Sequence, residues 1–534
     1  MPARTALVDS FARDRLPPPE ALPEFLFELP GLQFPDTLNC ATELLDRWVE
    51  SGQGDRLCIQ GEGGLRWTYA DLQAQANRIA RVLVEDLGLV SGNRVLLRGA
   101  NSPMLAACWF AVVKAGGIAV GSMPLLRARE LAPILEKGQI THALCDVRLA
   151  DELNAARPAC PTLQKLLFYG GELEARAASK PATFDNVKTA ADDTCLIAFT
   201  SGTTGVPKGT MHFHRDVMAA CACWPPHVLR AQPDDVFIGS PPLAFTFGLG
   251  GLLLFPMSIG ASCVLIEKAT PDALLPALAR YHASVVFTAP TSYRVMASQV
   301  AQHDLSSLRK CVSAGEALPA ATRTLWREAT GVEIIDGIGS TEMLHIFISA
   351  DEAHAKPGAT GVPVPGYRAM VLGDDGQELP RGQVGRLAVK GPTGCKYLDD
   401  PRQADYVRQG WNLTGDAYLV DDDGHFVYQA RTDDMIISGG YNIAGPEVES
   451  ALLLHPAVAE CGVIGQADAA RGQIVKAFVV LKPGFDGDAA MVKTLQDFVK
   501  QTVAPYKYPR EIVFAATLPR TETGKLQRFR LRQP

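Results

Sequence analysis

The chain has 534 residues, of which 47% are hydrophobic and 20% are charged, and its formal net charge is −7 at pH 7. This length exceeds the roughly 250 to 300 residues that one core supports, so two or more domains are expected. The composition excludes a mainly disordered chain, and the acidic balance gives no general attraction to nucleic acid or anionic lipid. The expected partner is therefore a small molecule, with no nucleic acid and no membrane.

Cysteine usage and the opening of the chain predict a cytoplasmic protein. The 12 cysteines are scattered, and the closest pair, Cys221 and Cys223, lacks the C-x-x-C spacing of a zinc or redox site. The opening "MPARTALVDSFARD" contains no apolar signal core. The cysteines are therefore expected to be reduced, mostly buried thiols.

Up to about residue 430, short apolar runs alternate with amphipathic stretches. "RVLLRGAN" (94–101) and "ITHALCD" (140–146) predict strands, and "SPMLAACWFAVVKAGG" (102–117) predicts a helix ended by glycine. "SVVFTAP", "KCVSAGE" and "EIIDGIGS" repeat the strand pattern. Buried strands alternating with helices indicate an α/β fold with largely parallel sheets. Ligands of such sheets bind where loops leave the carboxyl ends of the strands.

The stretch "FTSGTTGVPKGT" (199–210) follows the apolar run "TCLIAF" and has the composition of a phosphate-binding loop. Its glycines let backbone N–H groups approach an anion, its hydroxyls can donate hydrogen bonds, and Lys208 supplies a cation. The lysine lies three residues after Gly205, so this is not a Walker loop. Taken alone, the stretch is equally compatible with a Gly/Ser/Thr surface turn that carries a solvated lysine.

An uncharged segment covers residues 236–266 and is long enough to cross a membrane. Glycines and the prolines Pro241, Pro242 and Pro256 interrupt it, which favours a strand, a turn, a helix start and a second strand. The segment is therefore interpreted as buried core around a binding pocket.

The pattern of apolar and polar residues changes after about residue 385. Between about 385 and 430, "GRLAVKGP" and "DAYLVDDDGHFVYQA" predict a small antiparallel layer, with a hairpin tip and not a calcium loop at the three aspartates. A helix starting at Gly445-Pro446, strands in "VAECGVIG" and "IVKAFVVLKP", and a helix in "AAMVKTLQDFVKQTV" follow. These elements predict a small α+β domain over residues 433–534 after a large domain over residues 1–432.

Four further stretches join the glycine-rich one: "DGIGSTEM" (336–343), "LTGD" (413–416), "ARTDDMIISGGYNIAGPEVE" (430–449) and "LPRTETGKLQR" (518–528). Together, in order and spacing, these stretches resemble the motif set of the adenylate-forming superfamily, which includes acyl- and aryl-CoA ligases. The resemblance covers nearly the whole chain. It implies a two-step reaction in which ATP converts a carboxylic acid to an acyl-AMP, with release of pyrophosphate, and coenzyme A then takes the acyl group.

The resemblance assigns the ATP and magnesium sites to specific residues. It implies that Glu342 binds Mg²⁺, that Thr341 contacts the α-phosphate, that Asp416 accepts both ribose hydroxyls, and that Arg431 adds a cationic contact. The β- and γ-phosphates would be held by Thr200, Ser201, Gly202, Thr203, Thr204, Gly205 and Lys208. Asp336, Gly337 and Ile338 would line the adenine site, with Ile338 where many members carry a tyrosine.

The same resemblance implies a mobile C-terminal domain. Lys525 of "TETGK" takes the position of the family's catalytic lysine, which stabilises charge during adenylation. The C-terminal domain would then turn about a hinge at Asp433, and Gly440, Tyr441 and Asn442 would come to face the active site where the thiol enters.

The resemblance also implies an acyl pocket and a substrate. The implied pocket residues are Phe245, Phe247, Gly248, Ala314, Gly315, Gly339, His345 and Ile346. "DGIGSTEMLHIF" is similar to benzoate-CoA ligases, although Phe247 replaces their tyrosine. The stretch over residues 7–47 and "SGGYNIAGPEVE" look like 2-aminobenzoate-CoA ligases, so an aryl-CoA ligase is expected, with 2-aminobenzoate favoured over benzoate and other aromatic acids.

Several alternatives stay open at this level. The enzyme could load a carrier protein in trans, although the chain ends nine residues after Lys525 without a carrier-like domain. An inactive binding homologue and luciferase-like oxidation are further alternatives, and a homodimer is one of the oligomeric states left open.

Overall fold

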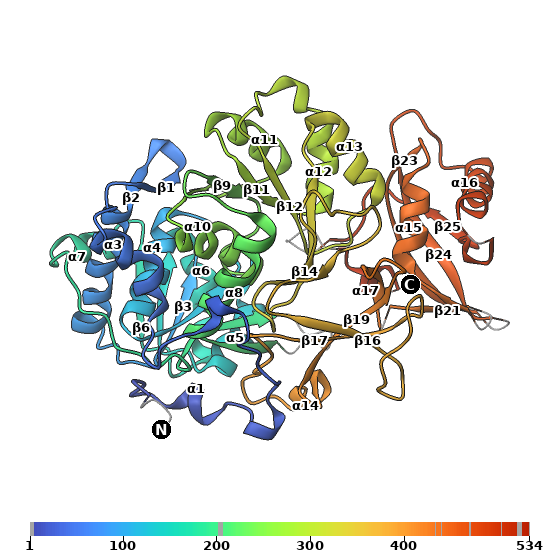
Figure 1. Ribbon diagram of the computed structural model, residues 1–534. Coiled ribbons are helices and arrows are strands. Elements are labelled where there is room, and N and C mark those ends of the chain that lie inside the picture. Colours follow the sequence, from blue (N-terminus) through green and yellow to red (C-terminus); the bar gives the residue numbers. More distant parts are fainter. Residues whose placement is uncertain are drawn as a thin grey trace.

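The computed structural model describes residues 5–200, 207–432, 434–438, 441–468, 471–503, 505–520 and 526–532. The described strands form four sheets, three before residue 432 and one in the C-terminal region. In Figure 1 the first three sheets fill the left and centre of the view, and the C-terminal elements from β21 onward lie at the right. This arrangement confirms the predicted α/β fold with a small C-terminal α+β part.

A six-stranded sheet carries the glycine-rich stretch, with strand order β6-β5-β3-β4-β7-β8. Its strands are β3 (Arg94–Arg98), β4 (Ile118–Ser122), β5 (His142–Asp146), β6 (Lys165–Tyr169), β7 (Thr194–Thr200) and β8 (Lys208–Phe213). All neighbours are parallel except β7 and β8, which pair antiparallel with Thr200 opposite Lys208. The glycine-rich stretch therefore leaves the carboxyl end of β7, as predicted.

A nine-stranded sheet forms the second layer, in the order β15-β14-β13-β12-β11-β9-β10-β1-β2. Its strands are β1 (Leu57–Gly61), β2 (Arg66–Thr68), β9 (Val236–Gly239), β10 (Ser262–Leu265), β11 (Val285–Thr288), β12 (Lys310–Ser313), β13 (Ile334–Gly339), β14 (Ile346–Ser349) and β15 (Val362–Pro363). The inner strands from β13 to β1 are parallel, and β2, β14 and β15 are antiparallel.

The uncharged segment supplies two neighbouring strands of this sheet and the helices that connect them. It runs from β9 through α9 (Thr246–Leu249), a π-helical turn (Gly250–Leu254) and α10 (Phe255–Ser258) to β10. Residues of the π-helical turn and Phe255 are fully buried, which confirms the interpretation as core. Among the described residues, no helix has the length and apolarity needed to cross a membrane.

Helices surround both sheets in Figure 1. The remaining α-helices before residue 432 are α1 (Phe11–Asp14), α2 (Arg47–Glu50), α3 (Tyr69–Arg81), α4 (Pro103–Lys114), α5 (Ala128–Gly138), α6 (Ala150–Ala156), α7 (Glu172–Ala178), α8 (His214–Trp224), α11 (Pro271–Arg280), α12 (Pro290–Ala297), α13 (Ala320–Thr330) and α14 (Gln403–Tyr406). Helix α4 shows why the sequence predicted it well. Ser102 Oγ accepts the Leu105 N–H at 3.2 Å as an N-cap, and the apolar residues that follow are buried.

The third sheet is antiparallel, as predicted for residues 385–430. It contains β16 (Arg368–Leu372), β17 (Gly385–Lys390), β18 (Val407–Arg408), β19 (Trp411–Val420) and β20 (Phe426–Arg431). The three aspartates form the tip of the β19-β20 hairpin. Lys356 Nζ donates to Asp421 at 2.7 Å and to Asp423 at 2.5 Å, so a side chain of the protein already balances this acidic tip.

The fourth sheet belongs to the C-terminal region. Its elements are β21 (Ile436–Ser438), β22 (Tyr441–Ile443), α15 (Gly445–Leu453), β23 (Val458–Asp468), β24 (Gly472–Leu481), α16 (Ala489–Thr502), β25 (Glu511–Phe514) and α17 (Arg528–Leu531). The predicted inward residues of α15, Val448, Ala451 and Leu452, are buried in a separate apolar cluster with residues of β23, β24 and α16. The C-terminal region therefore has a core of its own, and the boundary at Asp433 stays a prediction.

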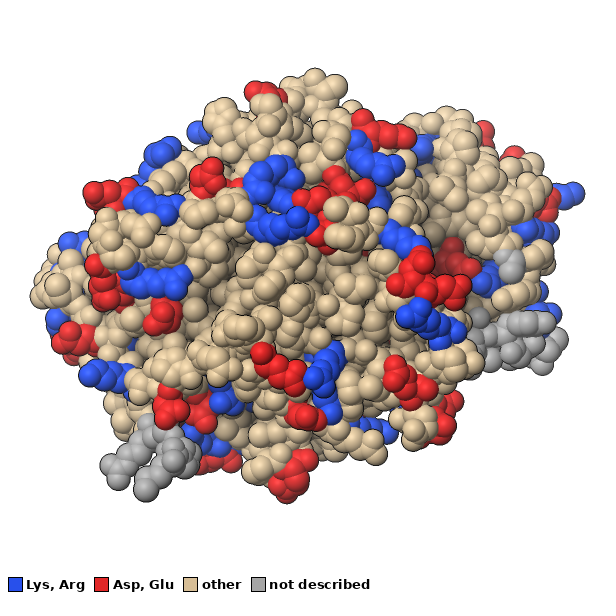
Figure 2. All heavy atoms as spheres, viewed as in Figure 1, with Lys and Arg blue, Asp and Glu red and all other residues tan. Residues whose placement is uncertain are grey.

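Figure 2 shows the charged side chains on the face seen in Figure 1. Lysine and arginine alternate with aspartate and glutamate around a central area of uncharged residues. This face thus presents both signs of charge side by side.

Candidate active site

The loop between β13 and β14 carries the "STE" residues. Asp336, Gly337, Ile338 and Gly339 end β13, and Ile346 begins β14. Within the loop, Leu344 is buried and has a φ of 71°, a left-handed conformation that costs a residue with a Cβ atom of order 1 kcal/mol or more. The packing around this turn holds it in place.

Glu342 contacts two side chains from other segments, the buried Tyr397 and the half-buried Lys208. Lys208 Nζ, on β8, donates to the Tyr397 hydroxyl at 2.8 Å, and that hydroxyl donates to Glu342 Oε1 at 2.5 Å. Lys208 Nζ lies 3.4 Å from the same oxygen. Burial, with the neighbouring Glu342 charge, raises the pKa of Tyr397 far above its usual range, so the hydroxyl keeps its proton and donates.

Thr341 is held through its backbone. The Nε2 atom of His212 lies 2.8 Å from the Thr341 carbonyl oxygen. Burial, followed by the positive charge of Lys396, lowers the pKa of His212 to about 4. The neutral ring therefore donates its Nε2 proton to Thr341, while Lys396 Nζ pairs with Asp216 at 2.7 Å beneath it.

Asp416 and Arg431 face each other across the β19-β20 hairpin. They are paired residues of the two strands, with 3.2 Å between Arg431 Nη1 and Asp416 Oδ1. Arg431 also donates to the Thr414 carbonyl at 3.1 Å. Gly415 has a φ of +78°, and a Cβ there would lie 2.7 Å from Arg431 Nη2, so the guanidinium packs directly over this glycine.

His345 lies in an aromatic cluster. Its ring centroid is 4.4 Å from Phe255, 5.6 Å from Phe247 and 5.9 Å from Trp224. Burial lowers the pKa of His345 to about 3, so the imidazole is neutral. Its Nε2 atom lies 3.4 Å from the Phe247 carbonyl oxygen, and its buried Nδ1 atom has no hydrogen-bond partner among the described residues.

Four further predicted pocket residues lie at α9 and in the loop after β12: Phe245, Gly248, Ala314 and Gly315. Phe245 lines an apolar cavity between the six-stranded sheet and α9, together with Leu249 and Leu253. Gly248 has no room for a side chain, because a Cβ would lie 2.1 Å from the Pro242 carbonyl oxygen. Ala314 is buried and Gly315 exposed after the carboxyl end of β12.

Several predicted site residues fall outside the described residues. They are Ser201, Gly202, Thr203, Thr204, Gly205, Asp433, Gly440 and Lys525. Tyr441 and Asn442 contribute backbone to β22, but their side chains are not described. Thr200 ends β7 at the base of the glycine-rich stretch.

Sequence reasoning missed the residues that position these groups. Tyr397, His212 and Lys396 were not predicted, because "GCKYLDD" and "GTMHFHRD" match no motif with a stated mechanism. Only His212 lies near a quoted motif in the sequence, four residues after Lys208, and nothing in the sequence marks Lys396 or Tyr397.

The donor set around Glu342 fits a hard divalent cation. Magnesium takes oxygen ligands, and Glu342 is a buried carboxylate beside the motif lysine. Both contacts that the described residues make to this carboxylate fall on Oε1. No hydrogen bond of the described residues falls on the second oxygen, Oε2, and this carboxylate would hold the cation.

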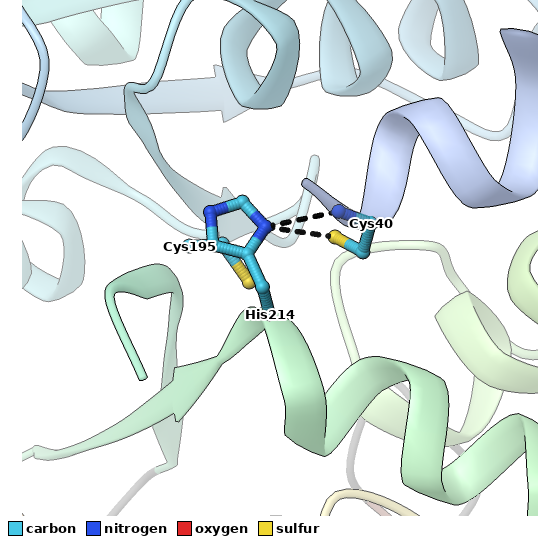
Figure 3. Close-up of side chains that lie close together, drawn as sticks. All are labelled: Cys40, Cys195 and His214. Carbon is cyan, nitrogen blue, oxygen red and sulfur yellow. Dashed lines mark hydrogen bonds between the residues drawn. The ribbon is translucent and has the colours of Figure 1, made fainter. Parts of the chain in front are cut away.

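Figure 3 shows a second polar cluster, formed by Cys40, Cys195 and His214. These are the kinds of side chain that bind zinc, and their ligand atoms lie within 4.8 Å of one another. However, the Cys40 backbone N–H donates to His214 Nδ1 at 3.1 Å, and the Cys40 Sγ lies 3.3 Å from the same atom. The lone pair on His214 Nδ1 therefore already accepts a hydrogen bond and is not free to bind a metal. The contacts of this cluster instead connect the segment around Cys40 to α8. All 12 cysteines are free and buried, as predicted.

Comparison with known proteins identifies the family. The AMP-binding enzyme family matches residues 45–397, and the AMP-binding enzyme C-terminal domain matches residues 447–525. The chain is 36% identical to the benzoate–CoA ligase of Thauera aromatica over 516 residues, which is 94% of this chain and 97% of that protein.

Two solved structures are also similar. The anthranilate CoA ligase AuaEII, in complex with anthranoyl-AMP, is 35% identical with a TM-score of 0.89, covering 94% of this chain and 98% of that one. A benzoate CoA ligase from Burkholderia xenovorans LB400 is 31% identical with a TM-score of 0.85, covering 93% and 100%. The chain therefore belongs to the adenylate-forming superfamily of AMP-binding enzymes, and within it the chain is similar to benzoate–CoA ligases.

Proposed function

We propose that this chain is an ATP-dependent aryl-CoA ligase whose preferred acid is 2-aminobenzoate. Full-length similarity to an anthranilate and to benzoate CoA ligases supports an aryl acid as the substrate. The structural observation that carries the proposal is the surroundings of His345, three residues after Glu342, where a neutral imidazole packs among the rings of Phe247 and Phe255. Flat, uncharged groups of this kind suit a planar ring.

In the first step, a carboxylate oxygen of the acid attacks the α-phosphorus of ATP, and the bond to pyrophosphate breaks. In the proposal Thr341 contacts the α-phosphate, Asp416 accepts the ribose hydroxyls and Arg431 adds positive charge. Asp336, Gly337 and Ile338 line the adenine site, and the glycine-rich stretch from Thr200 to Lys208 holds the outer phosphates. Magnesium bound at Glu342 would neutralise charge on the phosphate oxygens.

In the second step, the thiol of coenzyme A attacks the acyl carbon, and AMP leaves. We assign Lys525 to the first step and Gly440 and Tyr441 to the second. The small domain from residue 433 would exchange these groups by turning about Asp433. Its separate core is compatible with such a movement.

The test is ATP- and CoA-dependent thioester formation with 2-aminobenzoate, benzoate, other substituted benzoates and a medium-chain fatty acid, compared by kcat/KM. Because the ortho amino group can hydrogen-bond its own carboxylate, we expect a preference over benzoate of about 10- to 200-fold. Equal or better turnover of benzoate would make benzoate the substrate. Absence of pyrophosphate release with every acid would overturn the ligase proposal, and release without a CoA thioester would favour a carrier protein in trans.

A further inference from the structure

Tyr397 joins two residues that the proposed reaction uses. An ammonium group can only donate hydrogen bonds and a carboxylate can only accept them. The chain from Lys208 to the Tyr397 hydroxyl to Glu342 therefore has one direction, and the phenolic proton points at Oε1 of Glu342. At 2.5 Å this is a short hydrogen bond of the charge-assisted kind.

The ring of Tyr397 is fixed by its own surroundings. Its backbone N–H donates to Gln403 Oε1 at 2.9 Å, and its backbone bridges to Thr210 on β8, two residues after Lys208. The side chain is almost fully buried, and its ring lies 5.8 Å from that of Tyr406. The hydroxyl is thus a rigid donor aimed at Glu342.

We propose that Tyr397 is the positioning residue of the magnesium site: by donating to Oε1 it fixes the carboxylate of Glu342, which would hold the cation that accompanies ATP. This inference rests on the proposed ATP-dependent function. Before ATP binds, Lys208 balances the buried charge of Glu342. If Lys208 turned to the phosphates of bound ATP, Tyr397 would still donate to Oε1, so the carboxylate would keep one hydrogen bond and its orientation.

The test removes the hydroxyl alone, in Tyr397→Phe. Binding of Mn²⁺ to the full-length protein is measured by electron paramagnetic resonance in the presence of α,β-methylene-ATP, an analogue that cannot form the adenylate. Loss of a hydrogen bond to a charged group should weaken Mn²⁺ binding about 10- to 100-fold. Tyr293→Phe is the control, because Tyr293 is also fully buried and its hydroxyl donates to a backbone carbonyl, that of Val312, at 2.9 Å.

A double-mutant cycle with Glu342→Gln tests the route of the effect. If Tyr397 acts through Glu342, adding Tyr397→Phe to Glu342→Gln should weaken Mn²⁺ binding less than about 2-fold further. The KM for the acid should stay unchanged in Tyr397→Phe. Wild-type Mn²⁺ affinity in Tyr397→Phe, or a full additive loss in the double variant, would overturn the proposal. No Mn²⁺ binding by the wild-type protein with the analogue would instead overturn the ATP-dependent function itself.

Discussion

Arg520 of the C-terminal region and Glu316 of the loop after β12 form an ion pair, with 3.0 Å between Nη1 and Oε1. Glu316 directly follows Gly315, at the carboxyl end of β12. Arg520 precedes the stretch 521–525, and it bridges to Leu526 on the other side of that stretch. Arg520 and Leu526, the described residues on either side of this stretch, are therefore close together, and Arg520 contacts the residue that follows Gly315.

Arg520 also pairs with Glu460 of its own region at 3.0 Å, and the ion pair with Glu316 is the contact that predicts a selective effect of Arg520→Ala. An ion pair that is partly exposed contributes about 0.2–1 kcal/mol, so acid-dependent pyrophosphate release should slow by about 1.4- to 5-fold. Conversion of chemically prepared acyl-AMP to the thioester should keep its rate. Lys507→Ala is the control, since Lys507 pairs with Glu447 inside the C-terminal region. Equal slowing of both half-reactions would contradict the prediction.

Lys525→Ala should have a much larger effect on the same half-reaction. Removing one donor that stabilises developing charge costs about 10²- to 10³-fold in rate. Pyrophosphate release should fall by this factor, whereas thioester formation from preformed acyl-AMP should be nearly intact. An equal loss in both assays would remove Lys525 from its proposed role.

The type of most elements could be predicted from the sequence, because the spacing of apolar residues within each element shows which of its faces is buried. "RVLLRGAN" gives β3, and the helix expected at 102–117 is α4 with slightly shorter bounds. Its end is marked by Gly116, whose φ is 71°. Such signals depend on neighbouring residues, which is why element type was predictable along most of the chain.

The contacts that build the site could not be predicted in the same way. Lys208 and Tyr397 are separated by 189 residues, and His212 and Thr341 by 129. A periodic pattern indicates which face of an element is buried but not which distant segment covers it. The motif residues were found through resemblance, whereas the side chains that orient them required the packed structure.

Gly250→Ala should weaken binding of the aromatic acid. A Cβ at this position would lie 2.4 Å from Cδ2 of His345, and the ring is packed against Phe255 and Trp224. In an ordinary helix this substitution stabilises by about 1 kcal/mol, but here it must displace the imidazole. We expect the KM for 2-aminobenzoate to rise about 10-fold, which corresponds to about 1.4 kcal/mol.

The KM for ATP should stay within about 2-fold in the same variant, as the substitution is a steric change at the aromatic cluster. Gly31→Ala provides the control, because its Cβ would meet only an ordinary contact at 3.6 Å. A parallel rise in both KM values would point to a general distortion and contradict the prediction.

Asp336 predicts how stability depends on pH. Burial raises its pKa to about 7, from an ordinary value of 3.8. Between these values the folded protein keeps the proton and the unfolded chain releases it, so the folded state binds more protons. The free energy of unfolding should therefore fall as pH rises through this window, by about 1.4 kcal/mol per pH unit from this group, and level off above about pH 7.

Asp336→Asn removes this ionisation while keeping the size of the side chain. The free energy of unfolding of the variant minus that of the wild-type protein should be about 2–3 kcal/mol larger at about pH 8 than at about pH 5. The reason is that the wild-type protein must ionise the buried Asp336 carboxyl as pH rises, whereas the amide of the variant does not ionise. Urea unfolding of both proteins at the two pH values measures this difference. A stability difference that is the same at both values would mean that Asp336 is ionised in the folded protein throughout, with Arg323 and Ser313 compensating its charge.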